Sequence, residues 1–460
     1  MNSGPDIQPG FRPKVLLADS NYWALASRLA VGLKDVGCEV LAVCPDGHSL
    51  SKTSSVRRTF PYSGLRPLAS LMSAIDAAGP DFIVPCCERS LGHFHELYSK
   101  FRAQSEGGNE LRQLIERSLG APSSHSIVVS RYRLLELAKE EGIRVPRIAR
   151  IHNQEEIDNW CSLEPFPWVL KVDGTWGGGG VSIVRTPADA KTAMAQLGRM
   201  FRFRRAAKRL IVNRDRFDLR TWWKGADHEY SIQSFIQGRP GNCAVISWKG
   251  QVLAGIGVEV VRSDGATGPA NLVRVVENVE MMQAAKMIAS RLNLSGFFGL
   301  DFVIEEGSGH AYLIEMNPRT TPLCHLRLGK GRDMIAALYS ELAGQPCIEA
   351  APVTQKRLIA YFPQEEQSPN DFPEEWFYDV PSGEPQLMKE ILNPFPNRTL
   401  LFRLFETLSR KAKAEDRAGG NDWHGEAGNC EALEDSLLAT VAAPGKAETS
   451  SRGGGGLDLQ

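Results

Sequence analysis

Two carboxylates and an amide lie close together in the sequence beyond the middle of the chain. Asp301 interrupts one apolar run, and Glu315 and Asn317 interrupt the end of the next. The stretch between the runs, Glu305–His310, has the composition of a turn, so the two runs are expected to form a β-hairpin. Glu315 and Asn317 are two positions apart and share one face of their strand. Hard oxygen ligands that converge in this way suit Mg²⁺, and we expect a metal site at this end of the hairpin.

A cation follows on the same strand. Arg319 comes two positions after Asn317, and if the strand continues its guanidinium lies on the same face, where it could hold a transferring phosphoryl group. The alternative is a hairpin with ordinary solvated acids at its mouth. That alternative is weakened because Glu315 and Asn317 interrupt an otherwise apolar strand, and because a second phosphate-binding pattern lies upstream.

The second pattern is a glycine-dense loop between two β-rich runs, within Pro167–Val184. Its four consecutive glycines are Gly177, Gly178, Gly179 and Gly180. Glycines let backbone N–H groups approach phosphate oxygens closely, and Lys171 adds a point charge beside them. The loop is neither a P-loop, since the lysine precedes the glycines, nor a dinucleotide fingerprint, since a strand follows. Alone, such a loop is more often a flexible connection without a ligand.

Together these residues resemble the ATP-grasp superfamily, from about Ser130 to about Arg332. The resemblance implies two α+β subdomains that close on ATP. Ser130–Pro146 is similar to the helix and Gly-x-x-x-Pro segment that open this fold. The family usually has Asp-Lys there, and this chain has Ser-Arg, so Arg131 is the candidate for the first phosphate-contacting cation. Lys171 then matches the second phosphate lysine, and the four glycines match the lid over the phosphates.

The resemblance extends to the segment Ser231–Gly238, which looks like the hinge that receives adenine. Its contact residues would be Gln233, Ser234, Phe235 and Ile236. The hinge of the family commonly begins with Glu, so Gln233 departs in its side chain and leaves the backbone contacts intact. By the same match, Asp301, Glu315 and Asn317 hold the metal ions and Arg319 lies near the γ-phosphate. The implied cofactors are ATP and Mg²⁺, with Mn²⁺ as the alternative ion.

The resemblance implies an ATP-dependent carboxylate–amine ligase. Such an enzyme phosphorylates a small carboxylate to an acyl phosphate, and an amine then displaces the phosphate to give an amide. Two alternatives stay open. One is a carboxylase that acts through carboxyphosphate, although the chain contains no Met-Lys-Met biotin-attachment sequence. The other is a non-catalytic nucleotide-binding protein.

The order of expected elements predicts an α/β and α+β protein. Lys14–Ala18, the amphipathic stretch Trp23–Val36 and Glu39–Val43 begin a β-α-β pattern that implies a small parallel sheet. We expect a pre-ATP-grasp domain at 14–120, an ATP-grasp domain at 121–348, a C-terminal extension at 349–413 and a disordered tail at 414–460. Within the ATP-grasp domain we expect a small subdomain at about 130–237 and a large metal-binding subdomain at about 238–348. Within the extension, Gln364–Pro396 is proline-rich and expected to be irregular.

Composition agrees with this picture. The chain has 460 residues, of which 42% are hydrophobic and 23% charged, with a net charge of −1, so it is an ordinary globular chain without a global attraction to nucleic acid. A polar N-terminus and the lack of a long apolar run predict a cytoplasmic protein with no membrane span. Nine scattered cysteines favour a reducing compartment. The basic stretch Arg199–Lys224 is more typical of a solvated helix face than of a site for an anionic acceptor. Glu88 and Arg89 could touch a ligand after an apolar strand, although a surface ion pair or a helix start is the favoured interpretation.

Overall fold

The computed structural model describes residues 11–101, 106–173, 180–199, 230–263, 265, 268–348, 350–363 and 375–392. Three predicted features lie outside these ranges: the glycines Gly177, Gly178 and Gly179, the basic stretch beyond Arg199, and the tail 414–460. The chain divides into two compact units, residues 1–397 and 398–460. All of the described residues belong to the first unit.

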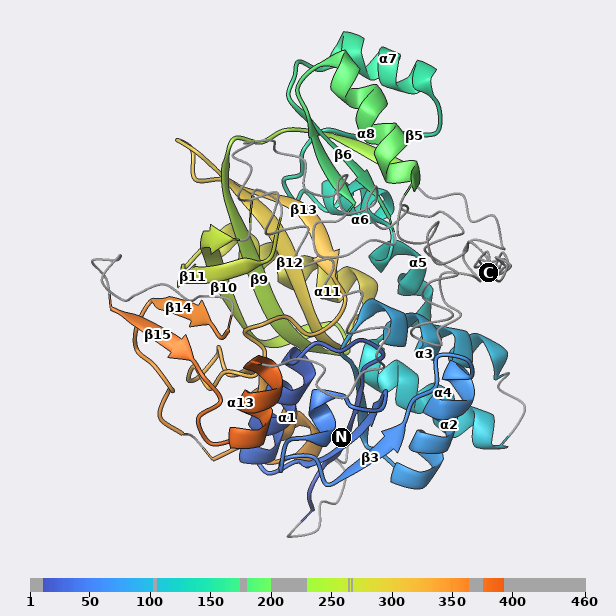
Figure 1. The fold of residues 1–460 in the computed structure, drawn as a ribbon, viewed down its shortest axis with the longest axis vertical. Coiled ribbons are helices and arrows are strands. Elements are labelled where there is room, and N and C mark those ends of the chain that lie inside the picture. Colours follow the sequence, from blue (N-terminus) through green and yellow to red (C-terminus); the bar gives the residue numbers. More distant parts are fainter. Residues whose placement is uncertain are drawn as a thin grey trace, which may run out of the picture. The chain divides into compact units, whose positions relative to one another are not determined.

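The N-terminal region is a parallel four-stranded sheet with helices, as the β-α-β pattern predicts (Figure 1). Its strands, in the spatial order β3-β2-β1-β4, are β1 (Lys14–Ala18), β2 (Glu39–Cys44), β3 (Arg58–Pro61) and β4 (Phe82–Pro85). Its helices are α1 (Leu25–Asp35), η1 (Ser49–Ser51), α2 (Pro67–Ala78), α3 (Glu88–Lys100), α4 (Glu106–Leu119), η2 (Pro122–Ser124) and α5 (His125–Val128). The central strands β2 and β1 are almost entirely buried because parallel strands are covered on both faces. The α2 helix has proline at its first turn and ends at Gly79, whose φ of 55° is one that glycine adopts without strain.

A second sheet is small and antiparallel, in the order β5-β8-β6-β7. It contains β5 (Ile148–Ile151), β6 (Trp168–Val172), β7 (Val181–Val184) and β8 (Tyr230–Ser234), and is preceded by α6 (Arg131–Glu140). Trp168, Leu170 and Ile232 pack with α7 (Gln154–Leu163) and α8 (Pro187–Arg199). Figure 1 shows these two helices beside the small sheet. The alternate residues, among them Lys171, therefore lie on the opposite face. The predicted hairpin around the glycine loop is confirmed, since β6 pairs with β7.

The third sheet has seven strands, in the order β13-β12-β9-β10-β11-β14-β15. Five of its strands are β9 (Gly238–Trp248), β10 (Gln251–Ser263), β11 (Ala270–Val275), β12 (Gly296–Glu305) and β13 (Ala311–Asn317), of which β13 lies at one edge. The helix α11 (Val279–Leu292) buries its apolar face against the sheet, and Asn278 caps its first turn. The predicted hairpin is confirmed: β12 and β13 are antiparallel, and Asp301 lies opposite Glu315.

The segment after residue 350 corrects one expectation. β14 (Leu358–Tyr361) and β15 (Trp376–Asp379) complete the edge of the large sheet as a parallel pair, and α13 (Pro385–Leu392) follows. Gln364–Pro396 was expected to be irregular, which is wrong for its described part. The reason is tertiary, because the four residues of β15 have no strong pattern of their own and are ordered by pairing with β14.

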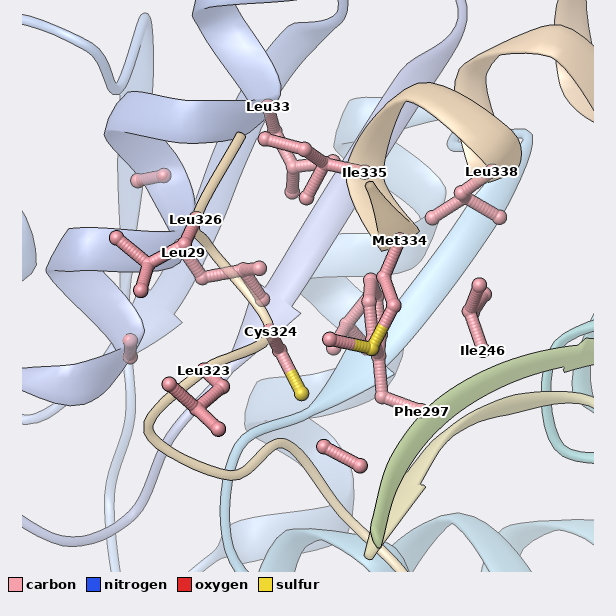
Figure 2. Packing of buried hydrophobic residues seen from close by; sticks show 14 of the residues in the cluster. Leu29, Leu33, Ile246, Phe297, Leu323, Cys324, Leu326, Met334, Ile335 and Leu338 are labelled. Atoms are coloured by element: carbon pink, nitrogen blue, oxygen red, sulfur yellow. The ribbon is translucent and has the colours of Figure 1, made fainter. Parts of the chain in front are cut away.

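One hydrophobic cluster joins the parallel sheet to the large sheet (Figure 2). Leu29 and Leu33 of α1 pack in it with Met334 and Ile335 of α12 (Met334–Ala343). Burial of each such side chain stabilises the fold by about 1.5–3 kcal/mol. The contact is close at Gly32, where a Cβ atom would lie 2.7 Å from Ile335 Cδ1 and 2.8 Å from a backbone oxygen. Within the described residues, no helix has the length and apolar character needed to span a bilayer.

Candidate active site

Asp301 is held between two amides on the large sheet. Its Oδ1 accepts a hydrogen bond from Asn242 Nδ2 at 2.6 Å, and its Oδ2 accepts one from Asn317 Nδ2 at 2.7 Å. Burial raises the pKa of Asp301 to about 6, the negative charge of Glu315 adds to the rise, and the two amides and Arg319 oppose it. The contact also orients Asn317, whose carboxamide oxygen is left for another donor or a cation.

Glu315, opposite Asp301, is paired with a cation from the start of α6. Its Oε1 accepts a hydrogen bond from Arg131 Nη2 at 2.7 Å. Burial by itself raises the pKa of Glu315, but the charges of Arg131 and Lys171 outweigh it and hold the pKa below the ordinary value. Glu315 is therefore an ionised, partly buried carboxylate.

Arg131 and Lys171 meet at the point where the small sheet touches the large one. Lys171 Nζ donates to the backbone oxygen of Ile314 at 3.2 Å, and Arg131 Nη1 donates to the backbone oxygen of Val172 at 2.7 Å and to Asp173 Oδ1 at 3.2 Å. Burial lowers the pKa of Lys171 to about 8, although Glu315 opposes the change. Burial likewise lowers the pKa of Arg131, but Glu315 and Asp173 outweigh it and raise that pKa overall.

The substitution of Asp-Lys by Ser-Arg at the start of α6 has a structural explanation. Ser130 is the N-cap of the helix, and its hydroxyl accepts a hydrogen bond from the backbone N–H of Arg133 at 3.3 Å. Serine satisfies this end of a helix as well as aspartate does. The cap places Arg131 in the first helical turn, from which its guanidinium reaches Glu315 on the other sheet.

Arg319 is fixed from both sides of the site. Its Nη2 lies 3.4 Å from Asn317 Oδ1, while its Nε donates to Glu88 Oε1 at 2.6 Å. Glu88 begins α3, so the favoured interpretation of a helix start is confirmed, and the residue also contacts the site. The guanidinium further lies over the ring of Trp23, 5.1 Å from its centroid. Two of the groups that orient Arg319, the Glu88 carboxylate and the Trp23 ring, therefore come from the N-terminal region that contains the parallel sheet.

The hinge residues Gln233–Ile236 lie at and just beyond the end of β8. The Ser234 N–H donates to the Arg147 oxygen at 2.9 Å, and the Phe235 N–H donates to the Pro167 oxygen at 3.3 Å. Gly180, the described glycine of the predicted lid, accepts from the Val172 N–H at 3.0 Å. The hinge is therefore hydrogen-bonded next to the start of β6, and Gly180 of the glycine loop is hydrogen-bonded to the end of β6.

The sequence missed several residues that complete this arrangement. Asn242 was detectable in principle, because it is a polar residue inside the largely apolar strand β9 and lies in register with Asp301. Asp173 lies directly after the strand of Lys171 and could have been read with it. Trp23 carried no local signal, since its partner Arg319 is almost three hundred positions away.

The donor set fits Mg²⁺ better than a transition metal. Asp301, Glu315 and the oxygen of Asn317 are hard oxygen ligands, and such sites are usually completed by phosphate and water. Across the described ranges, no group of three or more His, Cys, Asp or Glu side chains gathers as a metal cage. The cavity of about 30 Å³ that Met316 and Pro318 help to line is the size of one water molecule, so it is not a nucleotide site.

Comparisons with known proteins agree with this geometry. A family model described as an ATP-grasp domain matches residues 128–322. A search of the curated proteins found no relative of the chain. Among solved structures, the ADP complex of purK, an N5-carboxyaminoimidazole ribonucleotide synthetase, is 15% identical with a TM-score of 0.53, covering 75% of this chain and 81% of that one.

Two further structures have the same fold. The N5-carboxyaminoimidazole synthase of Aspergillus clavatus, in complex with ADP and 5-aminoimidazole ribonucleotide, is 13% identical. Its TM-score is 0.53, and the match covers 75% of this chain and 80% of that one. The biotin carboxylase of Campylobacter jejuni is 14% identical with a TM-score of 0.51, covering 74% and 72%. Identities this low establish the fold alone. Residues 128–322 are thus an ATP-grasp domain.

Proposed function

We propose that this protein is an ATP-dependent carboxylate–amine ligase that forms an amide through an acyl phosphate. The observation that carries the proposal is the convergence of Arg131 and Lys171 on the ionised Glu315, beside Asp301 and Arg319. Buried cations that face carboxylates across two sheets are costly to maintain for stability alone. They are useful where a triphosphate and its metal ion need charges of both signs.

The roles of the residues follow from their positions. Asp301, Glu315 and Asn317 would hold Mg²⁺, which when bound supplies neutralising charge to the phosphate oxygens. Lys171 and Arg131 offset the remaining phosphate charge, and Arg319 orients the transferring phosphoryl group through its planar guanidinium. Gly177, Gly178, Gly179 and Gly180 exclude water, because an acyl phosphate hydrolyses unproductively when water reaches it. The hinge Gln233–Ile236 receives the adenine.

The proposed use of ATP is supported by the family and by neighbours crystallised with ADP. The purK structure and the Aspergillus clavatus enzyme are both ADP complexes. The residues that would contact nucleotide in this chain, from Arg131 to Arg319, lie within the matched range 128–322. Formation of a carbon–nitrogen bond is our own inference, and carboxylation through carboxyphosphate is the rival reaction on this fold.

An ATP-turnover screen separates these functions. Phosphate release would be measured with pooled small carboxylates, with carboxylates plus amines, and with bicarbonate, and the products would be identified by mass spectrometry. A ligase requires both a carboxylate and an amine and gives an amide. Turnover that depends on bicarbonate instead supports the carboxylase, and ATP binding without turnover across the screen supports a non-catalytic nucleotide-binding protein.

Lys171→Ala should weaken ATP binding by about 30-fold or more, which corresponds to about 2 kcal/mol. The lysine is buried on β6, the strand that leads into the glycine loop, and no solvent cation can replace it at that position. Isothermal titration calorimetry with ATP and Mg²⁺ measures the effect. Lys286→Ala, on the exposed side of α11, is the matched control and should leave the affinity unchanged. Equal affinities in the two variants would remove Lys171 from the nucleotide site.

A further inference from the structure

A pocket lies on the large sheet apart from the residues that are proposed to bind nucleotide. Its volume is about 100 Å³, several times the space that a single water molecule needs. Its apolar wall is formed by Ile256 of β10, Val275 of β11 and Leu328. None of the proposed phosphate-binding or metal-binding residues lines it, so the proposed nucleotide site does not account for this pocket.

Positively charged side chains surround this apolar wall. Arg332, Lys356 and Arg357 line the pocket, whereas Glu277 is the only acidic lining residue in the part of the chain that the structure describes. The cations outnumber the acid, so the pocket attracts an anion. A ligand that matches both parts of the lining combines a negative group with a short apolar body.

The three cations are able to bind such a ligand. Arg332 forms an ion pair with Glu277, and Lys356 lies 3.5 Å from Glu375, but both pairs are exposed. Exposed ion pairs contribute little to stability, so these cations can turn to a ligand at a small cost in free energy. The guanidinium of Arg357 has no hydrogen-bond or ion-pair partner among the described residues.

Backbone hydrogen bonds hold the two sides of the pocket in place. On one side, the turn Leu328–Arg332 is fastened to β10, because the Gly255 N–H donates to the Gly331 oxygen at 3.0 Å. On the other side, the Val275 N–H donates to the Arg357 oxygen at 2.8 Å. The pocket is therefore formed before a ligand binds, and little ordering opposes binding.

The pocket shares a face of the sheet with the metal carboxylates but is some distance from them. Val275 and Asp301 are at the same level of the sheet, because Asn242 and Val258 link them through direct register pairs. Directly opposed residues share a face, and three strand spacings of about 4.8 Å separate the two backbones by about 14 Å. An anion in the pocket is therefore either the distal group of an extended substrate or a separate effector.

We propose that this pocket binds a small organic anion, a carboxylate or a phosphate on a short apolar body. The negative group contacts Arg357 through charge-assisted hydrogen bonds, and the apolar body lies on Ile256 and Val275. The proposal does not depend on the binding of ATP.

The test is an NMR titration of the full chain with butanoate and with butyl phosphate, and butan-1-ol is the uncharged comparison. The wild type should bind the anions with a Kd on the order of 1 mM, as expected for molecules of this size, and should not bind the alcohol. Arg357→Gln should raise the Kd about tenfold, because it removes a charge-assisted hydrogen bond. Arg117→Gln, on the exposed surface of α4, is the matched control and should leave the Kd unchanged.

Each contrary result overturns the proposal in a different way. No saturable binding of either anion at about twenty times that Kd would show that the pocket does not take anions. Equal binding by the wild type and Arg357→Gln would place the anion elsewhere on the protein. Butan-1-ol that binds as tightly as the anions would show that the cations play no part.

A second titration, with ATP and Mg²⁺ present, tells the two sources of the anion apart. Tighter binding identifies the anion as the distal group of a substrate, and unchanged binding identifies it as a separate effector. Displacement of the anion by ATP would place it in the nucleotide site and would refute the proposal. Because the first titration contains no ATP, the pocket can fail its test while the proposed function stands, and the reverse also holds.

Discussion

Glu315→Gln should abolish ATP turnover, with a loss of at least about 100-fold. The substitution keeps the shape of the side chain but removes the charge that helps to hold Mg²⁺ and that balances Arg131 and Lys171. Turnover fails because the metal ion and the cations are no longer matched around the phosphates. Phosphate release is measured over a range of Mg²⁺ concentrations, at the optimum substrate conditions of the wild type.

Glu306→Gln provides the matched control. This residue lies in the exposed turn of the same β12–β13 hairpin, and its substitution should leave turnover unchanged. In Glu315→Gln the carboxamide oxygen remains an acceptor for Arg131, and Arg131 keeps its contact with Asp173, so we expect that variant to stay folded and to melt in one cooperative transition. Full activity of Glu315→Gln at limiting Mg²⁺ would refute the metal site.

Asp379→Ala should cost about 3–5 kcal/mol of unfolding free energy, the largest effect on stability that we predict. Asp379 is buried, forms an ion pair with Arg28 of α1, and is hydrogen-bonded to His325 Nε2 at 2.8 Å. Truncation leaves a buried arginine without its counter-charge and removes the side-chain contacts to Arg28 and His325, although the hydrogen bond from Arg28 Nη1 to the backbone oxygen of residue 379 remains. Urea denaturation at pH 7 measures the change.

A surface ion pair in the same region serves as the comparison. Lys356 and Glu375 are 3.5 Å apart, and the Glu375 side chain is 85% exposed, so Glu375→Ala should change the unfolding free energy by less than about 0.5 kcal/mol. If the two variants lost similar amounts, the Asp379 cluster would have no special structural role.

The Asp379 effect should also depend on pH. Burial alone would raise the pKa of Asp379, but His325 and Arg28 outweigh it and hold the pKa below the ordinary value of 3.8. A carboxyl with a lowered pKa stabilises the fold above its unfolded-state pKa and loses that contribution as the pH falls through the folded-state pKa. The stability advantage of the wild type over Asp379→Ala should therefore be constant near neutral pH and shrink below about pH 4. If the wild type kept the same advantage at about pH 3 as at neutral pH, the lowered pKa of Asp379 would be contradicted.

The parts of the site that could be predicted from the sequence are those formed by local pattern. The hairpin of Asp301 and Glu315 and the strand of Lys171 are short alternating or apolar runs bounded by turn residues, which the sequence displays directly. Arg131 could be identified only through the resemblance of Ser130–Pro146 to the helix that opens the ATP-grasp fold. Residues that act through distant partners could not be predicted in this way.

Three distant contacts illustrate the limit. Asn242 reaches Asp301 through the register of β9 and β12, and Glu88 reaches Arg319 from 231 positions earlier in the chain. The pairing of His325 with Asp379 could not be predicted, because Asp379 lies in a segment whose sequence predicts irregular structure. Pairing of this kind is decided by tertiary packing, which overrides the weak local preference of a four-residue strand.

The late position of β15 and α13 has a consequence for synthesis on the ribosome. Asp379 binds Arg28 of α1, and Glu384 accepts hydrogen bonds from Thr53 and Ser55, so the end of the described chain closes onto its beginning. Domains usually fold from the N-terminus as the chain emerges. Here the parallel sheet, although made first, stays without these partners until residue 384 has left the exit tunnel. The surface of the parallel sheet region that Asp379 and Glu384 contact is therefore covered only after almost the whole described chain has been made.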